Sequence, residues 1–242
     1  MPVETIRNIE GRMSHPDQLP LLEASGIKKT FTNPLKINIL KEITLSVHGG
    51  ESIAILGRSG QGKSTLLQIL GTLEKATEGS LWIKGQNVTA FNVAEIRRKE
   101  IAFVFQSYFL LEDYTVLENV LIPARINRED TRPGSAAYLR ALDLLEQVEL
   151  TSRAHFNTKL LSGGEKQRTA IARSLCNNPD LIFADEPSGN LDDETASIIH
   201  KILLNFSKQP NKALVLVTHD TTLAALCSKR YILNSGTLNK IQ

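Results

Sequence analysis

The 242-residue chain contains two cysteines, one tryptophan and no long hydrophobic run. Cys176 and Cys227 lie in different segments and form no Cys-x-x-Cys pair, so neither a disulfide framework nor a zinc site is expected. Every apolar run is far shorter than the roughly 18 residues that a membrane helix needs. Residues 1–10 are charged rather than apolar, which argues against a secretory signal. We therefore expect a cytoplasmic protein without a membrane span of its own.

The chain also has little excess of one charge sign over the other. The chain has 28 Lys and Arg residues against 26 Asp and Glu residues, a formal net charge of +2. Nucleic-acid-binding proteins usually concentrate a large positive excess to neutralise phosphates, so we expect no nucleic-acid partner. Any anion that this protein binds must be held by local geometry.

The chain changes character along its length. Residues 1–20 are polar, contain three prolines and show no periodicity, which predicts a flexible leader. The remaining residues, 21–242, are predicted to form one domain of mixed α/β pattern, without internal repeats. The segment from about 91 to 160 is mostly helical in pattern and lacks strand-like runs after Phe105, so we predict a helical subdomain inserted into an α/β core.

The apolar pattern places strands and helices. Between Leu21 and Val47 short apolar runs alternate with polar residues, which favours antiparallel strands. A buried strand at Ile53–Leu56 then leads through a glycine-rich loop to a helix at Ser64–Leu73. Further strands are predicted at Leu81–Ile83, Ile101–Phe105, Leu181–Ala184 and Leu214–Val217, and helices at Ala136–Leu150 and Glu194–Phe206. In the first of these two helices we expect an apolar face made of Leu139, Leu142, Leu145 and Val148.

One glycine-rich motif follows the pattern G-x4-G-K-S and lies between the buried strand and the helix. Its glycines let successive backbone N–H groups turn inward around phosphate oxygens, and the helix N-terminus adds a positive partial charge. The lysine would reach the outer phosphates, and the serine hydroxyl would hold Mg²⁺. The motif consists of Gly57, Arg58, Ser59, Gly60, Gln61, Gly62, Lys63 and Ser64, and Thr65 follows it in the helix.

The strand at Leu181–Ala184 ends in two adjacent carboxylates. Asp185 is placed to bind Mg²⁺ through water, as the acidic partner of a phosphate loop does, and Glu186 to accept a proton from an attacking water. Adjacent side chains on a strand point to opposite sides, although the chain can turn beyond the strand end. The spacing alone therefore leaves the assignment of the two roles open.

A second candidate anion site is predicted at a later helix. Ser162 and Glu165 precede an apolar helical pattern with the spacing of a capping box. Gly163 and Gly164 lie between them and cost helix stability, so we expect something to approach this backbone closely. A hydroxyl, free N–H groups and the helix dipole together favour an anion. The chain thus has two predicted phosphate-binding helix ends.

In order and spacing, these motifs, together with Ser188-Gly-Asn-Leu-Asp192 and Thr218-His219-Asp220, resemble the ATPase domains of the ABC family. The likeness extends from about Leu21 to Leu238. It implies a P-loop NTPase core of the ABC-ATPase type with an antiparallel β subdomain and the inserted α-helical subdomain. It also implies a head-to-tail homodimer in the ATP state, in which each ATP lies between the phosphate loop of one chain and the Ser162 helix of the other.

The resemblance implies roles for individual residues. Phe31 is similar to the aromatic residue that stacks on adenine, although a core phenylalanine on an edge strand fits the sequence as well. Gln106 is similar to the glutamine that completes the Mg²⁺ shell and senses the transmembrane partner. Asp192 is similar to the residue that links the two ATP sites of the dimer. ATP and Mg²⁺ are the implied cofactors, and the implied catalytic residues are Lys63, Glu186 and the γ-phosphate contact His219.

These motifs do not identify the process that such an ATPase would drive. The resemblance favours an energising subunit bound to transmembrane permease subunits, peripheral on the cytoplasmic face of the inner (plasma) membrane. Tyr108-Phe-Leu-Leu111 and Glu186-Pro-Ser-Gly-Asn-Leu-Asp192 resemble the subgroup that acts in lipoprotein release, macrolide export and cell division, and lipoprotein release is the favoured member. A soluble ABC ATPase acting on DNA or ribosomes is the alternative from another class. A small-molecule kinase would leave the Ser162 motif and His219 unexplained.

Overall fold

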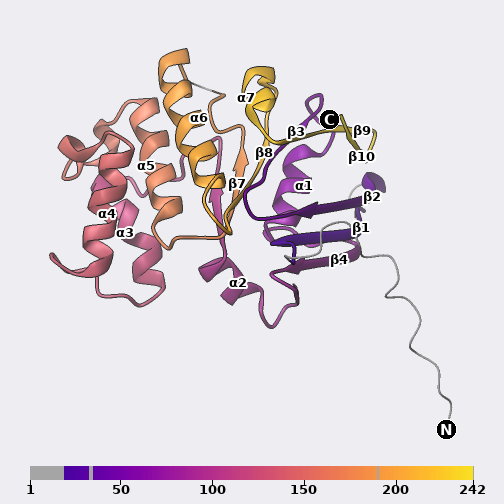
Figure 1. Cartoon of the computed structure of the whole chain (residues 1–242), viewed down its shortest axis with the longest axis horizontal. Helices are drawn as coiled ribbons and strands as arrows, with labels where there is room; N and C mark the ends of the chain where they lie inside the picture. The colour runs from indigo at the N-terminus through magenta and orange to yellow at the C-terminus, as the bar shows by residue number, and fades with distance from the viewer. Residues whose placement is uncertain (1–18, 33–34, 190, 242) are drawn as a thin grey trace, which may run out of the picture.

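The computed structural model of the protein describes residues 19–32, 35–189 and 191–241. It contains a four-stranded sheet in the order β2-β1-β4-β5 and a six-stranded sheet in the order β10-β9-β3-β8-β7-β6 (Figure 1). Residues 1–18 of the predicted leader lie outside the described residues, as does Asn190 of the motif that ends at Asp192.

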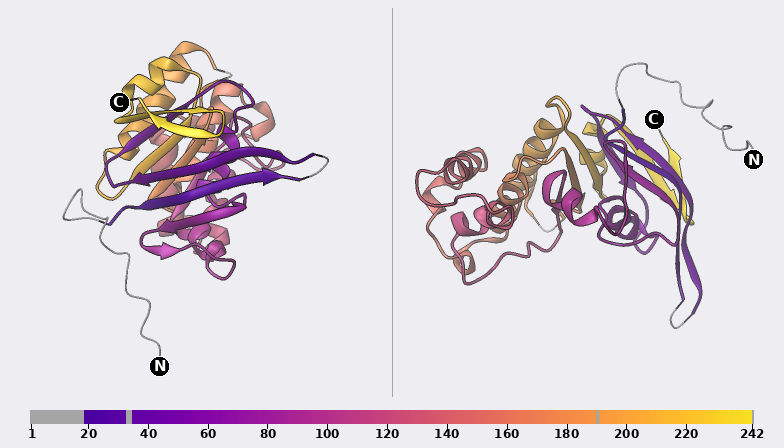
Figure 2. Two further views of the ribbon diagram at one scale, coloured as in Figure 1. Left: turned by 90° about the vertical axis from the view of Figure 1, so that its right-hand side faces the viewer. Right: turned by 90° about the horizontal axis from the view of Figure 1, so that it is seen from below.

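The four-stranded sheet is antiparallel, as the alternating sequence predicts. β1 (Leu22–Phe31) pairs with β2 (Ile37–Val47) and with β4 (Glu78–Ile83), and β4 pairs with the short β5 (Gln86–Asn87). One face of the sheet is buried, because alternate strand residues point into the core. β1 and β2 form a long ribbon that runs across the molecule (Figure 2).

The six-stranded sheet is mostly parallel. β3 (Ser52–Leu56), β8 (Ala213–Val217), β7 (Leu181–Asp185) and β6 (Ile101–Val104) are parallel neighbours. Their residues are mostly buried, as expected for strands covered on both faces. Because the strands are parallel, their carboxyl ends meet at one edge. The sheet is completed by β9 (Lys229–Asn234), parallel to β3, and β10 (Thr237–Lys240), antiparallel to β9.

Helices cover both faces of this sheet. α1 (Lys63–Leu70) packs with the antiparallel sheet on one face, and α5 (Gly163–Leu175), α6 (Asp193–Ser207) and α7 (Thr221–Leu226) pack on the other. A separate apolar core joins α5 to α3 (Val116–Ile126) and α4 (Ala136–Gln147), and these helices form the layer seen beside the sheets (Figure 2). The remaining helical segments are α2 (Val93–Lys99) and two 3₁₀ turns, η1 (Thr151–Arg153) and η2 (Thr158–Leu160).

The predicted α/β class with an antiparallel sheet and a helical layer is confirmed. The expected apolar face of α4 is partly wrong, because Leu139 is 53% exposed whereas Ala137, Ala141 and Leu144 are buried. A stripe at three-residue steps drifts around a helix that has 3.6 residues per turn, so the buried face follows steps of three and four. The helical core also extends past residue 160 to Ala172 and Cys176, while β6 lies in the main sheet.

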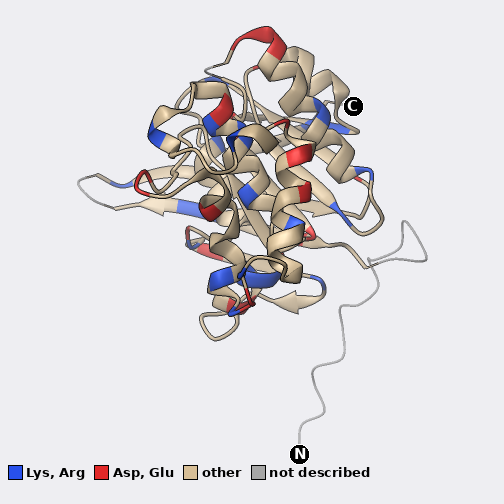
Figure 3. Cartoon of the chain, turned by 90° about the vertical axis from the view of Figure 1, so that its left-hand side faces the viewer, with Lys and Arg blue, Asp and Glu red and all other residues tan. Residues whose placement is uncertain are grey.

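The surface carries charges of both signs close together. On the face of the helical layer, acidic and basic residues are interspersed (Figure 3). Several of them are paired, including Arg140 with Glu129 at 2.7 Å and Arg153 with Glu165 at 3.0 Å. Among the helices of the described ranges, none has the length and apolar character to cross a bilayer.

Candidate functional site

A cavity of about 550 Å³ opens at the carboxyl ends of the parallel strands. Ligands of open α/β sheets bind at this edge, beyond the strand ends. Residues from four separate sequence motifs meet here, although the motifs span more than half of the chain. The cavity is lined by Ile39, Gly57, Arg58, Ser59, Gly60, Gly62, Lys63, Ser64, Thr65, Gln106, Asp185, Glu186 and His219.

The glycines of the loop after β3 are required by close packing. Gly57 has φ 155°, and a Cβ there would lie 2.6 Å from the Leu233 carbonyl oxygen. Gly62, the residue before α1, has φ 92°, and its Cβ would lie 2.5 Å from Cγ2 of Ile39. Neither position can accept a side chain without displacing its neighbour. The loop therefore passes close to the adjoining strands and delivers the N-terminus of α1 to the cavity, where an anion is favoured.

The Lys63 ammonium lies over this loop. Its Nζ donates to the carbonyl oxygens of Gly57 at 2.9 Å and Arg58 at 3.2 Å. These neutral acceptors hold the ammonium at the cavity wall without neutralising its charge. A phosphate group bound there would meet one full positive charge and the helix N-terminus together.

Ser64, in the first turn of α1, meets Asp185, the last residue of β7. The Ser64 hydroxyl donates to Oδ1 of Asp185 at 3.1 Å. Burial raises the pKa of the Asp185 carboxyl, and the neighbouring Glu186 carboxylate raises it further, while the Ser64 hydrogen bond and Lys63 act in the opposite direction. A divalent cation would relieve this cost. Together with the amide of Gln106, which lines the same cavity, these groups form an oxygen donor set of the kind that suits Mg²⁺.

Glu186 has an unusual backbone and a histidine partner. Its φ is 47°, in the left-handed region that non-glycine residues rarely adopt. Its N–H donates to the Val217 carbonyl oxygen at 2.9 Å, which fixes the turn after β7. Its Oε2 lies 2.9 Å from Nδ1 of His219 and accepts from the His219 N–H at 3.3 Å. This turn brings both Asp185 and Glu186 to one cavity, which the alternation of a regular strand would not do.

Phe31 and Gln61 are predicted ligand residues whose side chains do not line the cavity. The Phe31 side chain at the end of β1 is 41% exposed, and Nζ of Lys29 lies 4.8 Å from its ring centre. Gln61 is part of the loop, but its Oε1 accepts from the Ser235 N–H at 2.9 Å. The Gln61 side chain therefore braces the loop against the β9–β10 turn. Adenine stacking by Phe31 stays a prediction.

The second predicted anion site lies at the start of α5 and does not line the cavity. Its capping box is complete, because the Glu165 N–H donates to Oγ of Ser162 at 3.3 Å and the Ser162 N–H donates to Glu165 at 2.8 Å. A Cβ on Gly163 would lie 3.0 Å from the Tyr108 hydroxyl, and one on Gly164 would lie 2.7 Å from Cγ2 of Thr195. The close approach expected at these glycines thus comes from side chains of the same chain.

Asp192 is the N-cap of α6. Its carboxylate accepts from the N–H and from the hydroxyl of Thr195, both at 2.9 Å. These hydrogen bonds lower the pKa of Asp192. Within one chain the residue therefore acts as a helix cap, and its predicted role between two ATP sites remains a prediction.

Gln167 is a site residue that the sequence reasoning missed. It lies on α5, is 1% exposed, and its Nε2 donates to the Pro187 carbonyl oxygen at 2.8 Å. The same atom lies 3.5 Å from the Phe105 carbonyl oxygen. One amide thus ties α5 to the loops that carry Glu186 and Gln106. The signal available in the sequence was a glutamine on the apolar side of the predicted helix.

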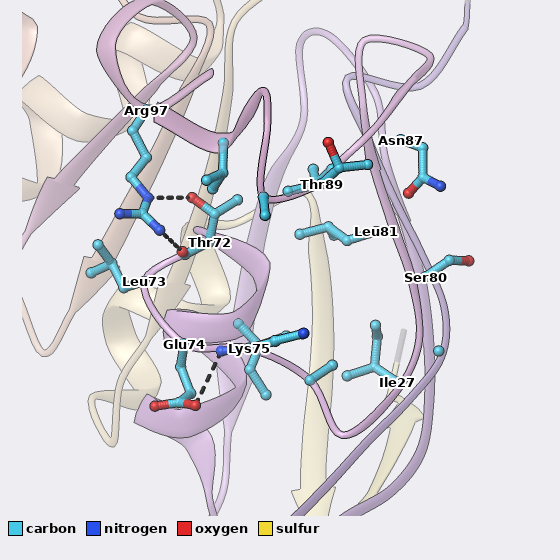
Figure 4. Close-up of a pocket in the computed structure, with 16 residues that line it drawn as sticks. Ile27, Thr72, Leu73, Glu74, Lys75, Ser80, Leu81, Asn87, Thr89 and Arg97 are labelled. Carbon is cyan, nitrogen blue, oxygen red and sulfur yellow. Dashed lines mark hydrogen bonds between the residues drawn. The ribbon is translucent and has the colours of Figure 1, made fainter. Parts of the chain in front are cut away.

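A second cavity, of about 570 Å³, lies between the antiparallel sheet, the end of α1 and α2 (Figure 4). Half of its lining residues are aliphatic, and the guanidinium of Arg97 is already bound to Thr72, through Nε to Oγ1 at 3.0 Å and through Nη2 to the carbonyl oxygen at 2.6 Å. The paired carboxylates and the glycine-rich loop are all at the other cavity. The chemistry of the motifs therefore belongs to the edge of the parallel sheet.

Comparison with known proteins gives a consistent result. Residues 40–189 match the ABC transporter family. The lipoprotein-releasing system ATP-binding protein LolD of Protochlamydia amoebophila is 57% identical over 224 residues, which cover 93% of this chain and 98% of that protein. The LolD protein of Bdellovibrio bacteriovorus is 41% identical over 219 residues, covering 89% and 98%. Among solved structures, the dimeric post-hydrolysis state of the ATP-binding cassette MJ0796 bound to ADP and Pi is 35% identical with a TM-score of 0.83, covering 91% of this chain and 99% of that one.

Proposed function

Because the chain belongs to the ABC transporter family, we propose that it is the ATP-hydrolysing subunit of a complex that releases lipoproteins from the inner membrane. The observation that carries the ATPase assignment is the meeting of Lys63, the Ser64–Asp185 pair and the Glu186–His219 pair in one cavity. Lipoprotein release as the process driven by this hydrolysis is supported by the names of relatives that match about nine tenths of this chain.

The phosphates of ATP would bind at the loop of Gly57–Ser64. The backbone N–H groups at the start of α1 and the Lys63 ammonium supply positive charge there, and little covalent chemistry is needed from the protein. Ser64, Asp185 and Gln106 would hold Mg²⁺, which supplies further charge neutralisation at the phosphates. Their oxygen-rich side chains meet at the same strand edge.

Glu186 would act as the general base. Its carboxylate lies at the cavity and can accept a proton from a water molecule placed in line with the γ-phosphate. His219 donates to the same carboxylate from its backbone N–H and contacts it through Nδ1, and Nε2 of its exposed imidazole would reach a phosphate oxygen on the cavity side. Both residues therefore orient the attack rather than form a covalent intermediate.

A second copy of the chain would complete each site. Ser162, Gly163, Gly164 and Glu165 lie at a helix start outside the cavity of their own chain, and the MJ0796 relative is dimeric. In a head-to-tail pair, each ATP would lie between the Gly57–Ser64 loop of one chain and the α5 N-terminus of the other, with Asp192 between the two sites. Permease subunits in the inner membrane would hold this pair at the cytoplasmic face.

The test uses Glu186→Gln, which keeps the shape of the side chain and removes the base. With ATP and Mg²⁺ this variant should form a stable dimer in light scattering and release no phosphate, whereas the wild type should turn ATP over and return to monomer. A Glu186→Gln variant that hydrolyses ATP at the wild-type rate contradicts the assignment of the base.

Lipoprotein release is tested by reconstituting the complex with its permease subunits in proteoliposomes that contain a radiolabelled lipoprotein. Wild-type chain should release the lipoprotein to a soluble acceptor when ATP is added, and the Glu186→Gln complex should not. ATP hydrolysis by the complex without lipoprotein release would leave the ATPase assignment standing and would exclude lipoprotein release as the driven process.

A further inference from the structure

His200 is a buried histidine that the motifs leave without a role. It lies on α6 between Ile199 and the core residue Leu203, and it is 8% exposed. A polar ring in such a position is costly unless its nitrogen atoms find partners. Its contacts therefore indicate what holds it there.

The His200 ring touches two loops of the site. Its Nε2 is hydrogen-bonded to Oγ of Ser188 at 2.8 Å, and it lies 3.8 Å from Oδ2 of Asp220. Ser188 is two residues after Glu186, and Asp220 directly follows His219. One imidazole thus contacts both the loop that carries the general base and the loop that carries its histidine partner.

Both loops are already tied to each other on the cavity side. Nδ1 of His219 lies 2.9 Å from Glu186, and the Gly189 N–H closes the Glu186 turn by donating to the Glu186 carbonyl oxygen at 3.2 Å. Asp220 is anchored in turn, because its Oδ1 accepts from the N–H groups of Thr222 at 2.7 Å and Leu223 at 3.1 Å. His200 therefore links the two loops a second time, on the side away from the cavity, and so completes a ring of contacts.

The ring of contacts supports a strained residue. Glu186 keeps a φ of 47°, which a non-glycine residue holds only where its surroundings fix it. Burial lowers the pKa of His200, and the carboxylate of Asp220 raises it in part, so the neutral imidazole is favoured. A neutral ring bonds the Ser188 hydroxyl without adding a buried charge.

We propose that His200 is a positioning residue for ATP hydrolysis, which holds the Glu186 turn and the His219 loop in register through Ser188 and Asp220. The proposal rests on the function proposed above for Glu186 and His219. It predicts a loss in turnover rather than in ATP binding, since His200 is behind the cavity wall and does not line it.

The experiment measures kcat and KM for ATP, together with thermal unfolding, on full-length variants. His200→Leu removes the ring nitrogen atoms, and loss of one neutral hydrogen bond at the transition state corresponds to about a fivefold lower kcat. KM for ATP should stay within about twofold of the wild type, because no phosphate contact is removed. His200→Gln keeps a donor and an acceptor and should recover most of the lost kcat.

Three further variants separate positioning from general destabilisation. Ile199→Val removes one core methylene from the neighbouring position and should lower the unfolding temperature while leaving kcat unchanged. Ser188→Ala should lower kcat like His200→Leu, and the double variant should be no slower than either single one. Multiplied losses in the double variant, or equal kcat for His200→Leu and the wild type, would overturn the proposal.

Glu186→Gln is measured in the same assay. If it removes turnover and His200→Leu does not lower kcat, the positioning role fails and the proposed function stands. If Glu186→Gln leaves turnover intact, the proposed function fails, and the positioning role fails with it.

Discussion

At the scale of single residues, Glu186 shows how local strain serves the site. A left-handed backbone at a non-glycine residue costs on the order of 1–3 kcal/mol. Here that conformation brings the carboxylate to His219 and to the cavity that Asp185 also lines, instead of letting it follow the strand alternation. The bond to the Val217 carbonyl oxygen, the Gly189 turn and Gln167 at Pro187 hold the turn in place.

Lys63 offers the most direct residue-scale prediction. Its ammonium rests on two loop carbonyl oxygens and pairs with no carboxylate among the described residues, so its charge is available to a phosphate. Lys63→Ala should abolish ATP binding in isothermal titration calorimetry and change the unfolding temperature little. Lys99→Ala, which removes an exposed lysine paired with Glu95, is the matched control and should bind ATP normally. Unchanged ATP affinity in Lys63→Ala would contradict the phosphate site.

At the scale of elements, two helices begin with the same cap. α3 starts with a capping box of Thr115 and Glu118, and α5 with one of Ser162 and Glu165. Loss of a cap hydroxyl costs about 1 kcal/mol, so Thr115→Ala and Ser162→Ala should lower the free energy of unfolding by similar amounts.

The two caps should differ in activity. Only Ser162 faces a partner's ATP in the proposed dimer, so Ser162→Ala should slow ATP hydrolysis and Thr115→Ala should not. Chemical denaturation and phosphate release measure the two effects on the same samples. Equal activity of the two variants would show that the α5 cap is structural alone.

Elements with a strong motif or a buried apolar run were predictable. The strands that end at the cavity are short continuous apolar runs, and the helix starts at Lys63 and Gly163 follow signals that act within a few residues. The β9–β10 hairpin was missed because its residues are mostly polar or half exposed and lack a clear alternation. The Thr115–Glu118 capping box follows a local Thr-x-x-Glu pattern and was therefore also predictable from the sequence.

Part of the site could not be derived from the sequence because it depends on tertiary packing. The φ of Glu186, the bond from Gln61 to Ser235 and the contact of Thr195 with Gly164 join segments or conformations that no local pattern encodes. Gln167 and His200 are polar residues on core-facing helix positions, and a sequence reports such residues without their partners.

At the scale of the whole molecule, each chain of the proposed dimer would contribute one half to each of the two ATP sites. In the head-to-tail pair, one ATP would use Lys63 of one chain and Ser162 of the other. A dimer of one Lys63→Ala chain and one Ser162→Ala chain therefore keeps one unaltered site, whereas either homodimer keeps none.

Mixing the two variants in equal amounts should restore ATP hydrolysis. Half of the dimers would be mixed, and each would have one of its two sites intact, so the rate should reach about a quarter of the wild type if the sites act independently. Phosphate release before and after mixing measures this recovery. No recovery, with dimers present in light scattering, would contradict the shared sites.

The helix α5 gives the paired molecule a further property. Its N-cap Ser162 would meet the partner's nucleotide, and about 7.5 Å further along the axis Gln167 holds the backbone beside Glu186. A helix over this length is stiff, so a shift of its first turn would be transmitted to Pro187 through the Gln167 hydrogen bond. In the proposed dimer, the nucleotide at one site would thereby influence the water-activating carboxylate of the other site through α5 itself, which would couple the two ATP molecules mechanically.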